Sequence, residues 1–517
     1  MTAYLSRVRQ HFANWRDWEL NPIVVKELRQ TVRSRAVTGT LMMFLLVLFC
    51  AALMFFVTQS FDDSTDQRLG AGIFFYFLLV LTSASVFFIP IYIGVRVAME
   101  RTENDLDLLY ISTLSPSRII RGKFLCGAYV AVLFFSACMP FMTFTNLLRG
   151  VDLPSVFFAL LCVFLIVCCL VQAAIFIACL PISRLLKILI LLFALPVKGY
   201  FVAGITMGIS EMMMQGVGSM MSRSSFWEGF FTISGVVLAA ALLLYFLSVA
   251  LVTPPSANRA PPVRIYMTAF WLISGLISIV WVAKQKEPRL ILPWAIISIV
   301  LFSLSLVVTV SNSDTLSLRV QRTIPERLPR RAIAFLFYNG AAGGLVWTAL
   351  IFAATFAVLW KTLLSGTSVS VMDKEDFDAI MYTSAAAIFY VFDYALVGLF
   401  LHRKLLPRRS PRFAGIFAVI VPAAWAVIPV LIFFFLNRLS TRDLEHIQLG
   451  NIFNIFVVGM NAQKEEHLIF AAGWLCVMLL LNLSWFIKRL KSFQPLRRTK
   501  ASTATMDAPP IIPAAVS

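Results

Sequence analysis

Residues 100–123 read ERTENDLDLLYISTLSPSRIIRGK, and this stretch organises the rest of the chain. It lies between two long apolar runs, so we expect it at a membrane surface. Its acidic residues are Glu100, Glu103, Asp105 and Asp107. Leu106, Leu109 and Tyr110 form a short apolar stripe at helical spacing, and Ser115 and Pro116 then predict an N-cap and the first residue of a new helix. The pattern indicates a docking site for a partner protein, and the alternative is a solvated acidic face.

The composition places the chain in a membrane. Of its 517 residues, 60% are hydrophobic and 14% charged, and the mean hydropathy is +0.85. A soluble domain is about half apolar and about a quarter charged. The formal net charge of +18 would suggest nucleic acid as the partner of a soluble chain, but in a membrane protein the basic residues gather on cytoplasmic loops and meet anionic lipid. We therefore expect membrane lipid as a partner and no nucleic acid.

Twelve apolar runs have about the 20 residues that a helix needs to cross the hydrocarbon core. They are residues 38–59, 70–98, 123–148, 154–180, 185–209, 228–252, 265–283, 290–310, 332–360, 378–401, 414–436 and 467–487. In the fifth run, Pro196 and Lys198 favour a break in the helix. The sequence thus predicts an all-α, polytopic integral membrane protein with about 12 transmembrane helices.

The charges of the loops predict the orientation of these spans. With the N-terminus inside and every second loop assigned to the cytoplasm, most of the 44 Lys and Arg residues fall on the inner side. The outer loops take most of the acidic residues, as at 62–66 and 373–378. This positive-inside pattern predicts that both termini are cytoplasmic. The acidic residues of 100–107 lie on this basic side, against the trend, which favours a docking role for them.

The chain divides near Pro254 and Pro255, in a proline-rich loop between six runs and six. The predicted regions are a cytoplasmic N-terminus at 1–37, a six-span domain at 38–252, a linker at 253–264, a second six-span domain at 265–487 and a basic tail at 488–517. The end of the tail has the composition of a disordered segment. The first 37 residues lack a signal-peptide cleavage site, so the first span is expected to be an uncleaved anchor.

A basic amphipathic helix is predicted directly before the first run, in NPIVVKELRQTVRSR at 21–35. Asn21 and Pro22 are good residue types for an N-cap and a first helical position. Its apolar face consists of Val24, Val25, Leu28 and Val32. Its polar face consists of Lys26, Arg29, Gln30 and Arg33. Such a helix lies in the membrane interface, and the alternative is a solvated linker.

These two motifs, in this order around two spans, resemble the permease subunits of type-2 ATP-binding-cassette (ABC) transporters, which are mostly exporters. In that family an interfacial connecting helix precedes the first span, and a cytoplasmic coupling helix after the second span receives the ATPase subunit. By this resemblance, the connecting helix contains Asn21, Pro22, Lys26, Glu27 and Arg29. The coupling segment, residues 99–122, contains Glu100, Arg101, Glu103, Asp105, Asp107, Leu108, Leu109, Thr113, Leu114 and Ser115, and Gly122 and Lys123 open the third span.

The resemblance covers roughly residues 20–250 and implies ATP-driven export across a bacterial cytoplasmic (inner) membrane. It implies two permease units, as a homodimer or paired with a related chain, and separate ABC ATPase subunits. The second half, 265–487, departs from the family pattern. Two alternative functions therefore stay open, namely an ion-coupled secondary transporter and a non-transporting scaffold that recruits a cytoplasmic ATPase.

The sequence lacks the motifs of the common catalytic sites. No phosphate-binding loop of the form GxxxxGK[ST] occurs, so ATP hydrolysis by that route needs another subunit. The patterns HExxH and GxSxG and the paired-cysteine zinc spacing are also absent. We therefore expect no enzymatic activity, no metal site and no cofactor.

Three polar residues inside apolar runs are candidates for function. Asp393 lies deep in the tenth run, where an ionisable group costs about 2.5–3.5 kcal/mol on insertion scales unless it is satisfied. It is either a proton or substrate contact, or the structural partner of a nearby Lys, Arg or Tyr. Lys198 either lies in a pathway or snorkels towards the surface. Gln172 either faces a polar path or bonds between helices, and packing is the simpler interpretation.

Overall fold

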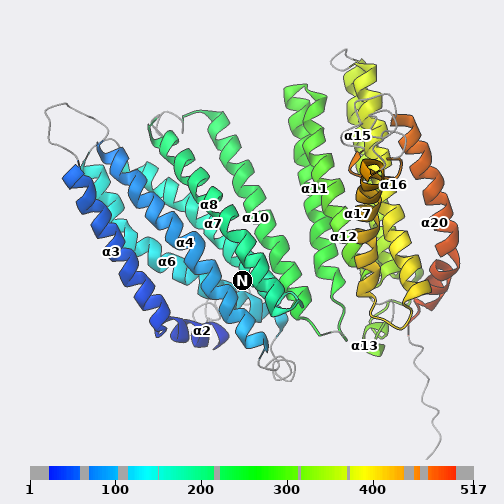
Figure 1. The fold of residues 1–517 in the computed structure, drawn as a ribbon, viewed down its shortest axis with the longest axis horizontal. Helices are drawn as coiled ribbons and strands as arrows, with labels where there is room; N and C mark the ends of the chain where they lie inside the picture. The colour runs from blue at the N-terminus through cyan, green and yellow to red at the C-terminus, as the bar shows by residue number, and fades with distance from the viewer. Residues whose placement is uncertain are drawn as a thin grey trace, which may run out of the picture. The chain divides into compact units, whose positions relative to one another are not determined.

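The computed structural model describes residues 22–58, 69–102, 115–148, 151–214, 222–254, 256–312, 316–368, 373–435, 448–454 and 464–495, and within these ranges it contains helices and no strands (Figure 1). Contacts divide the chain into two compact units, unit 1 from Met1 to Pro254 and unit 2 from Pro255 to Ser517. Twelve helices in the described ranges are long and apolar enough to cross a membrane, and each predicted run overlaps one of them. The prediction of an all-helical, multi-pass membrane protein is thus confirmed.

Unit 1 consists of α2 (Pro22–Val32), α3 (Arg35–Thr58), α4 (Leu69–Thr102), α6 (Pro116–Leu147), α7 (Leu153–Cys179), α8 (Arg184–Met214) and α10 (Ser224–Val252). Its central helix is α4, which packs against α3, α6, α7 and α8. Phe74, Phe77 and Leu81 recur along α4 at helical spacing and are fully buried. Gly127 lets α6 approach α7, because a Cβ there would come 2.5 Å from Cγ1 of Val171.

Unit 2 consists of α11 (Ala260–Gln285), the short 3-10 helix η1 (Pro288–Ile291), α12 (Leu292–Val310), α13 (Leu318–Gln321), α14 (Leu328–Phe337), α15 (Ala341–Ser368), α16 (Lys374–Leu405), α17 (Arg412–Phe435) and α20 (Lys464–Ser492). The central helix is α16, against which α12, α15, α17 and α20 pack. Small residues permit this close packing, since a Cβ on Gly398 would overlap the backbone of α17 at Ala414. The middle of α16 is therefore enclosed by the neighbouring helices.

The ninth predicted run, 332–360, is wrong in its first part. The chain breaks between α14 and α15 at Gly340, whose φ of +141° suits glycine far better than other residues. Arg264 of α11 binds this break, because its guanidinium donates hydrogen bonds to the carbonyl oxygens of Leu336 (2.7 Å) and Tyr338 (2.8 Å). The membrane-spanning helix therefore starts only at Ala341.

The fifth run also differs from the prediction. Helix α8 continues without interruption from Arg184 to Met214, and Pro196 lies inside it. The expected break beside Pro196 and Lys198 is absent. Proline removes one backbone hydrogen bond of a helix, and a long membrane helix accommodates that loss when its other backbone groups stay paired.

Candidate functional site

Charged side chains form a network where α2 meets the ends of α4 and α6. Glu27 comes from α2, Arg96 and Glu100 from the last turns of α4, and Lys123 from the start of α6. Figure 1 shows α2 running across the direction of the long helices. Glu27 Oε2 lies 3.1 Å from Arg96 Nη2, and Glu27 Oε1 lies 3.4 Å from Lys123 Nζ. Glu100 forms an ion pair with the same Lys123 ammonium and lies 3.9 Å from Arg96 Nε.

Arg96 connects this network to the rest of α2. Its Nη1 donates hydrogen bonds to the hydroxyl of Thr31 (2.8 Å) and to the hydroxyl of Tyr92 (3.3 Å), and its Nη2 donates to the side-chain oxygen of Gln30. The Thr31 hydroxyl donates to the carbonyl oxygen of Glu27 (2.7 Å) and lies 3.0 Å from Cys126 Sγ on α6. One face of α2 is thus attached to both α4 and α6.

Burial makes the pairing of these charges important. Glu27 is 6% exposed and Lys123 is 8% exposed, while Glu100 remains partly exposed at the rim. Two acids and two bases together carry no net formal charge. Removing one partner from a buried pair leaves an unpaired charge and costs about 3–5 kcal/mol. The network is therefore a rigid connection between three helices rather than a loose surface contact.

The face of α2 that packs inside the protein includes polar residues. Lys26 and Arg29 are exposed, as the amphipathic pattern predicts. Val32, on the predicted apolar face, is 52% exposed and does not pack inside the protein. The buried face contains Val24, Glu27 and Thr31. Glu27 pairs with the Arg96 guanidinium and the Lys123 ammonium, and Thr31 accepts a hydrogen bond from Arg96.

Several residues of the two motifs lie outside the described structure. They are Asn21, Glu103, Asp105, Asp107, Leu108, Leu109, Thr113 and Leu114. Pro22 begins α2, and Arg101 lies in the last turn of α4, but the side chains of both are likewise not described. Ser115 holds the N-cap position of α6, as predicted, with Pro116 first in the helix. Its hydroxyl makes no capping hydrogen bond and instead lies 3.2 Å from the hydroxyl of Ser117.

The structure brings together Glu27 and Glu100, one from each predicted motif, and adds two residues that the sequence reasoning missed. Arg96 is simplest to interpret from sequence as a cytoplasmic anchor, and Lys123 as the opening of a span. A signal was present in Arg96 and Glu100, which are four residues apart on one helix and of opposite charge. Glu100, which the acidic pattern and the resemblance both assign to the docking segment, pairs with Lys123 of its own chain.

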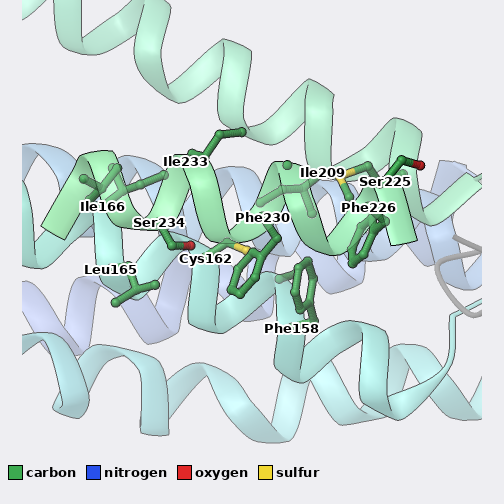
Figure 2. A pocket seen from close by; sticks show the side chains of 14 residues that line it. Phe158, Cys162, Leu165, Ile166, Ile209, Ser225, Phe226, Phe230, Ile233 and Ser234 are labelled. Carbon is green, nitrogen blue, oxygen red and sulfur yellow. The ribbon is translucent and has the colours of Figure 1, made fainter. Parts of the chain in front are cut away.

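A second feature of unit 1 is an apolar cavity of about 310 Å³ among α7, α8 and α10 (Figure 2). Phe158 of α7 lies against two rings of α10, with centroid distances of 5.3 Å to Phe226 and 4.9 Å to Phe230. Ser225 and Ser234 contribute hydroxyl groups to an otherwise apolar lining. The cavity suits an apolar group, and no sequence motif marks it.

The three intramembrane polar residues lie in different settings. Gln172 is buried and donates a hydrogen bond to the Ser248 hydroxyl (3.3 Å), which joins α7 to α10. Lys198 is partly exposed on α8. Asp393 is 0% exposed, and no described residue donates a hydrogen bond to either of its oxygens. The expected structural partner, a Lys, Arg or Tyr, is therefore not found among the described residues.

Comparisons with protein-family models, with curated proteins and with solved structures found no match for this chain. In the part of the chain that the structure describes, no group of three or more His, Cys, Asp or Glu residues could hold a metal ion. Function is therefore inferred from the helices, the charged network and the cavity.

Proposed function

We propose that this chain is the membrane-spanning permease component of an ATP-driven ABC export system in a bacterial inner membrane. A separate ATPase subunit docks on the coupling segment at the cytoplasmic side, and ATP binding moves that segment. The observation that best supports this proposal is the charged network, because it joins the two helices that flank the segment. A force applied between Thr102 and Ser115 reaches α4 and α6 together.

The ion pair of Glu100 with Lys123 links the last turns of α4 to the start of α6, and so holds together the two helices that the coupling segment joins. Glu27 extends this connection to α2, the proposed connecting helix. Buried, mutually paired charges resist separation, so the three helix ends move as one body. Motion of the ATPase is in this way passed to α4, the central helix of unit 1.

Transport needs a second permease unit, supplied by another copy of the chain or by a related chain. Helix α8 exposes many large apolar side chains, including Leu185, Phe193 and Phe201, which suit contact with lipid or with that second unit. The apolar cavity among α7, α8 and α10 is a candidate contact for an apolar part of the exported substrate. Unit 2 has no counterpart in the resemblance.

The docking step is tested by purification of the tagged chain from membranes of its native host. We expect the native chain to retain an ATPase subunit with a Walker A motif, identified by mass spectrometry. The triple variant Glu103→Gln, Asp105→Asn, Asp107→Asn should lose that subunit. Glu100 is left unchanged because it pairs inside the chain.

A matched control is the triple variant Asp62→Asn, Asp63→Asn, Asp66→Asn, which removes the same charge from a loop predicted on the other side of the membrane. This variant should keep the ATPase. The proposal fails if the native chain carries no ATPase, or if both triple variants behave alike.

A further inference from the structure

Unit 2 contains a buried polar cluster that the export proposal does not use. Its centre is Asp393 on α16, which is fully buried and receives no hydrogen bond from a described residue. Tyr390 and Tyr394, one turn apart on the same helix, stack with a centroid distance of 6.4 Å. A charged carboxylate without donors is strongly disfavoured in such a place, whereas a protonated one is tolerated.

The tyrosine hydroxyls tie this part of α16 to two other segments. Tyr394 donates to the carbonyl oxygen of Gly450, and the Gly450 N–H donates to the Tyr390 hydroxyl at 3.0 Å. The Tyr390 hydroxyl also lies 3.2 Å from Nδ1 of His467, near the start of α20. The second lone pair of the Tyr390 oxygen can accept from the Nδ1–H of His467, which leaves the hydroxyl proton of Tyr390 available to Asp393.

His467 is the outermost of the three groups Asp393, Tyr390 and His467. It is 2% exposed, and its Nε2 has no hydrogen-bond partner among the described residues. It lies three residues after Lys464, at the end of α20 that the loop charges predict to face outwards, next to the exposed Glu465 and Glu466. Because each of its two ring nitrogens can bind a proton, an imidazole in this position can relay one from the end of α20 inwards to Tyr390.

We propose that Asp393 is a proton-binding site and that His467 and Tyr390 deliver its proton. A proton binds Nε2 of His467, and the proton on Nδ1 moves to the Tyr390 oxygen. The Tyr390 hydroxyl proton moves to a carboxylate oxygen of Asp393 through one bridging water molecule, since no hydrogen bond joins the two groups directly. After these transfers the imidazole and the hydroxyl are neutral again, and Asp393 holds the proton. Release follows the same steps in reverse.

A metal cation fits this site less well than a proton. Sodium or calcium requires several oxygen ligands, and here the tyrosine hydroxyls and the Gly450 backbone are bonded to one another. Other ionisable groups do not compensate the Asp393 charge. Helix α12, α17 after Arg412 and residues 448–454 contain no ionisable group. Lys361 of α15 and Cys476 of α20 are exposed. Arg403 lies near the C-terminal end of α16, and the C-terminal end of α20 holds Lys488, Arg489 and Lys491.

The test uses the purified full-length chain in liposomes, without ATPase or nucleotide, so its result is independent of the export proposal. Infrared difference spectra between acidic and alkaline pH should show a protonated carboxyl band that disappears in Asp393→Asn and persists in Asp393→Glu. Asp376→Asn is the matched control, because Asp376 lies on the same helix but is exposed. A band unchanged in Asp393→Asn would overturn the proposal.

The delivery route is tested by following the infrared band of Asp393 over time after a rapid drop in pH. In the native chain the band should appear quickly. His467→Gln and Tyr390→Phe should slow its appearance while leaving its final size unchanged. Appearance at the native rate in both variants would refute the route. Circular dichroism and gel filtration should show that each variant retains the native helical state.

Discussion

Lys123 Nζ lies 3.4 Å from Oε1 of Glu27, a residue 96 positions away in the sequence. Both side chains are almost fully buried, and they join the short helix α2 to the start of α6. Such a pair is costly to disrupt and easy to test by single substitutions.

Glu27→Gln should destabilise unit 1. The variant keeps the shape of the side chain but leaves Arg96 and Lys123 with Glu100 as their remaining acid in the network. The expected loss is about 3–5 kcal/mol, the usual cost of removing one partner of a buried pair. Thermal unfolding of the detergent-purified chain should show a lower Tm. Lys26→Gln, on the exposed face of the same helix, is the control and should leave the Tm unchanged.

Lys123→Met should uncouple transport from ATP hydrolysis. Methionine fills a similar volume but pairs with neither Glu27 nor Glu100, so the three helix ends lose their common counter-charge. We expect the ATPase to co-purify and to hydrolyse ATP, while export in reconstituted vesicles falls. Lys123→Arg retains the charge and should restore part of the coupling. Export at the native rate in Lys123→Met would contradict the proposed role of the network.

Gly229→Trp should fill the apolar cavity of unit 1. Gly229 lines the cavity, and a side chain added there meets open space. We expect saturable binding of a dansyl-labelled fatty acid to the native chain, measured by fluorescence, and loss of that binding in the variant. Gly235→Trp is the matched control, since Gly235 lies on the same helix with equally open surroundings but outside the cavity. Equal binding by the two variants would show that the cavity does not hold the probe.

Arg264→Lys should lower the stability of unit 2 despite keeping the charge. The Arg264 guanidinium reaches three carbonyl oxygens at the break between α14 and α15, those of Leu336, Tyr338 and Gly340. A lysine ammonium cannot match that planar set of donors, and each charged hydrogen bond lost costs about 1.5–3 kcal/mol. Thermal unfolding measures the effect, with the exposed Arg330→Lys as control. Equal Tm values would mean that the break is held by other contacts.

Hydropathy was sufficient to predict the spans, because about 20 apolar residues in a row leave a helix few alternatives in lipid. The same criterion placed the start of the ninth span too early. Residues 332–337 are apolar enough to extend it, and only the conformation of Gly340 and the hydrogen bonds of Arg264 reveal the break. Those hydrogen bonds join residues more than seventy positions apart, which local patterns do not record.

The candidate site was also predictable only in part, because its ion pairs join residues far apart in the sequence. The two motifs directed attention to Glu27 and Glu100, and Asp393 stood out as a carboxylate within an apolar run. The partners of Glu27 could not be identified, since an amphipathic pattern treats a glutamate as solvent-facing unless its counter-ions are known. Asp393 shows the opposite case, in which a partner was expected and none is found among the described residues.

The close approach of Thr31 and Cys126 gives the protein an internal reporter. The Cys126 thiol is covered by α2, so a water-soluble maleimide reaches it only when α2 lifts away from α6. In a chain whose other seven cysteines are replaced by alanine or serine, the labelling rate would follow that opening directly. Comparing the rate with and without bound ATPase and nucleotide would show at which point of the proposed cycle α2 separates from α6.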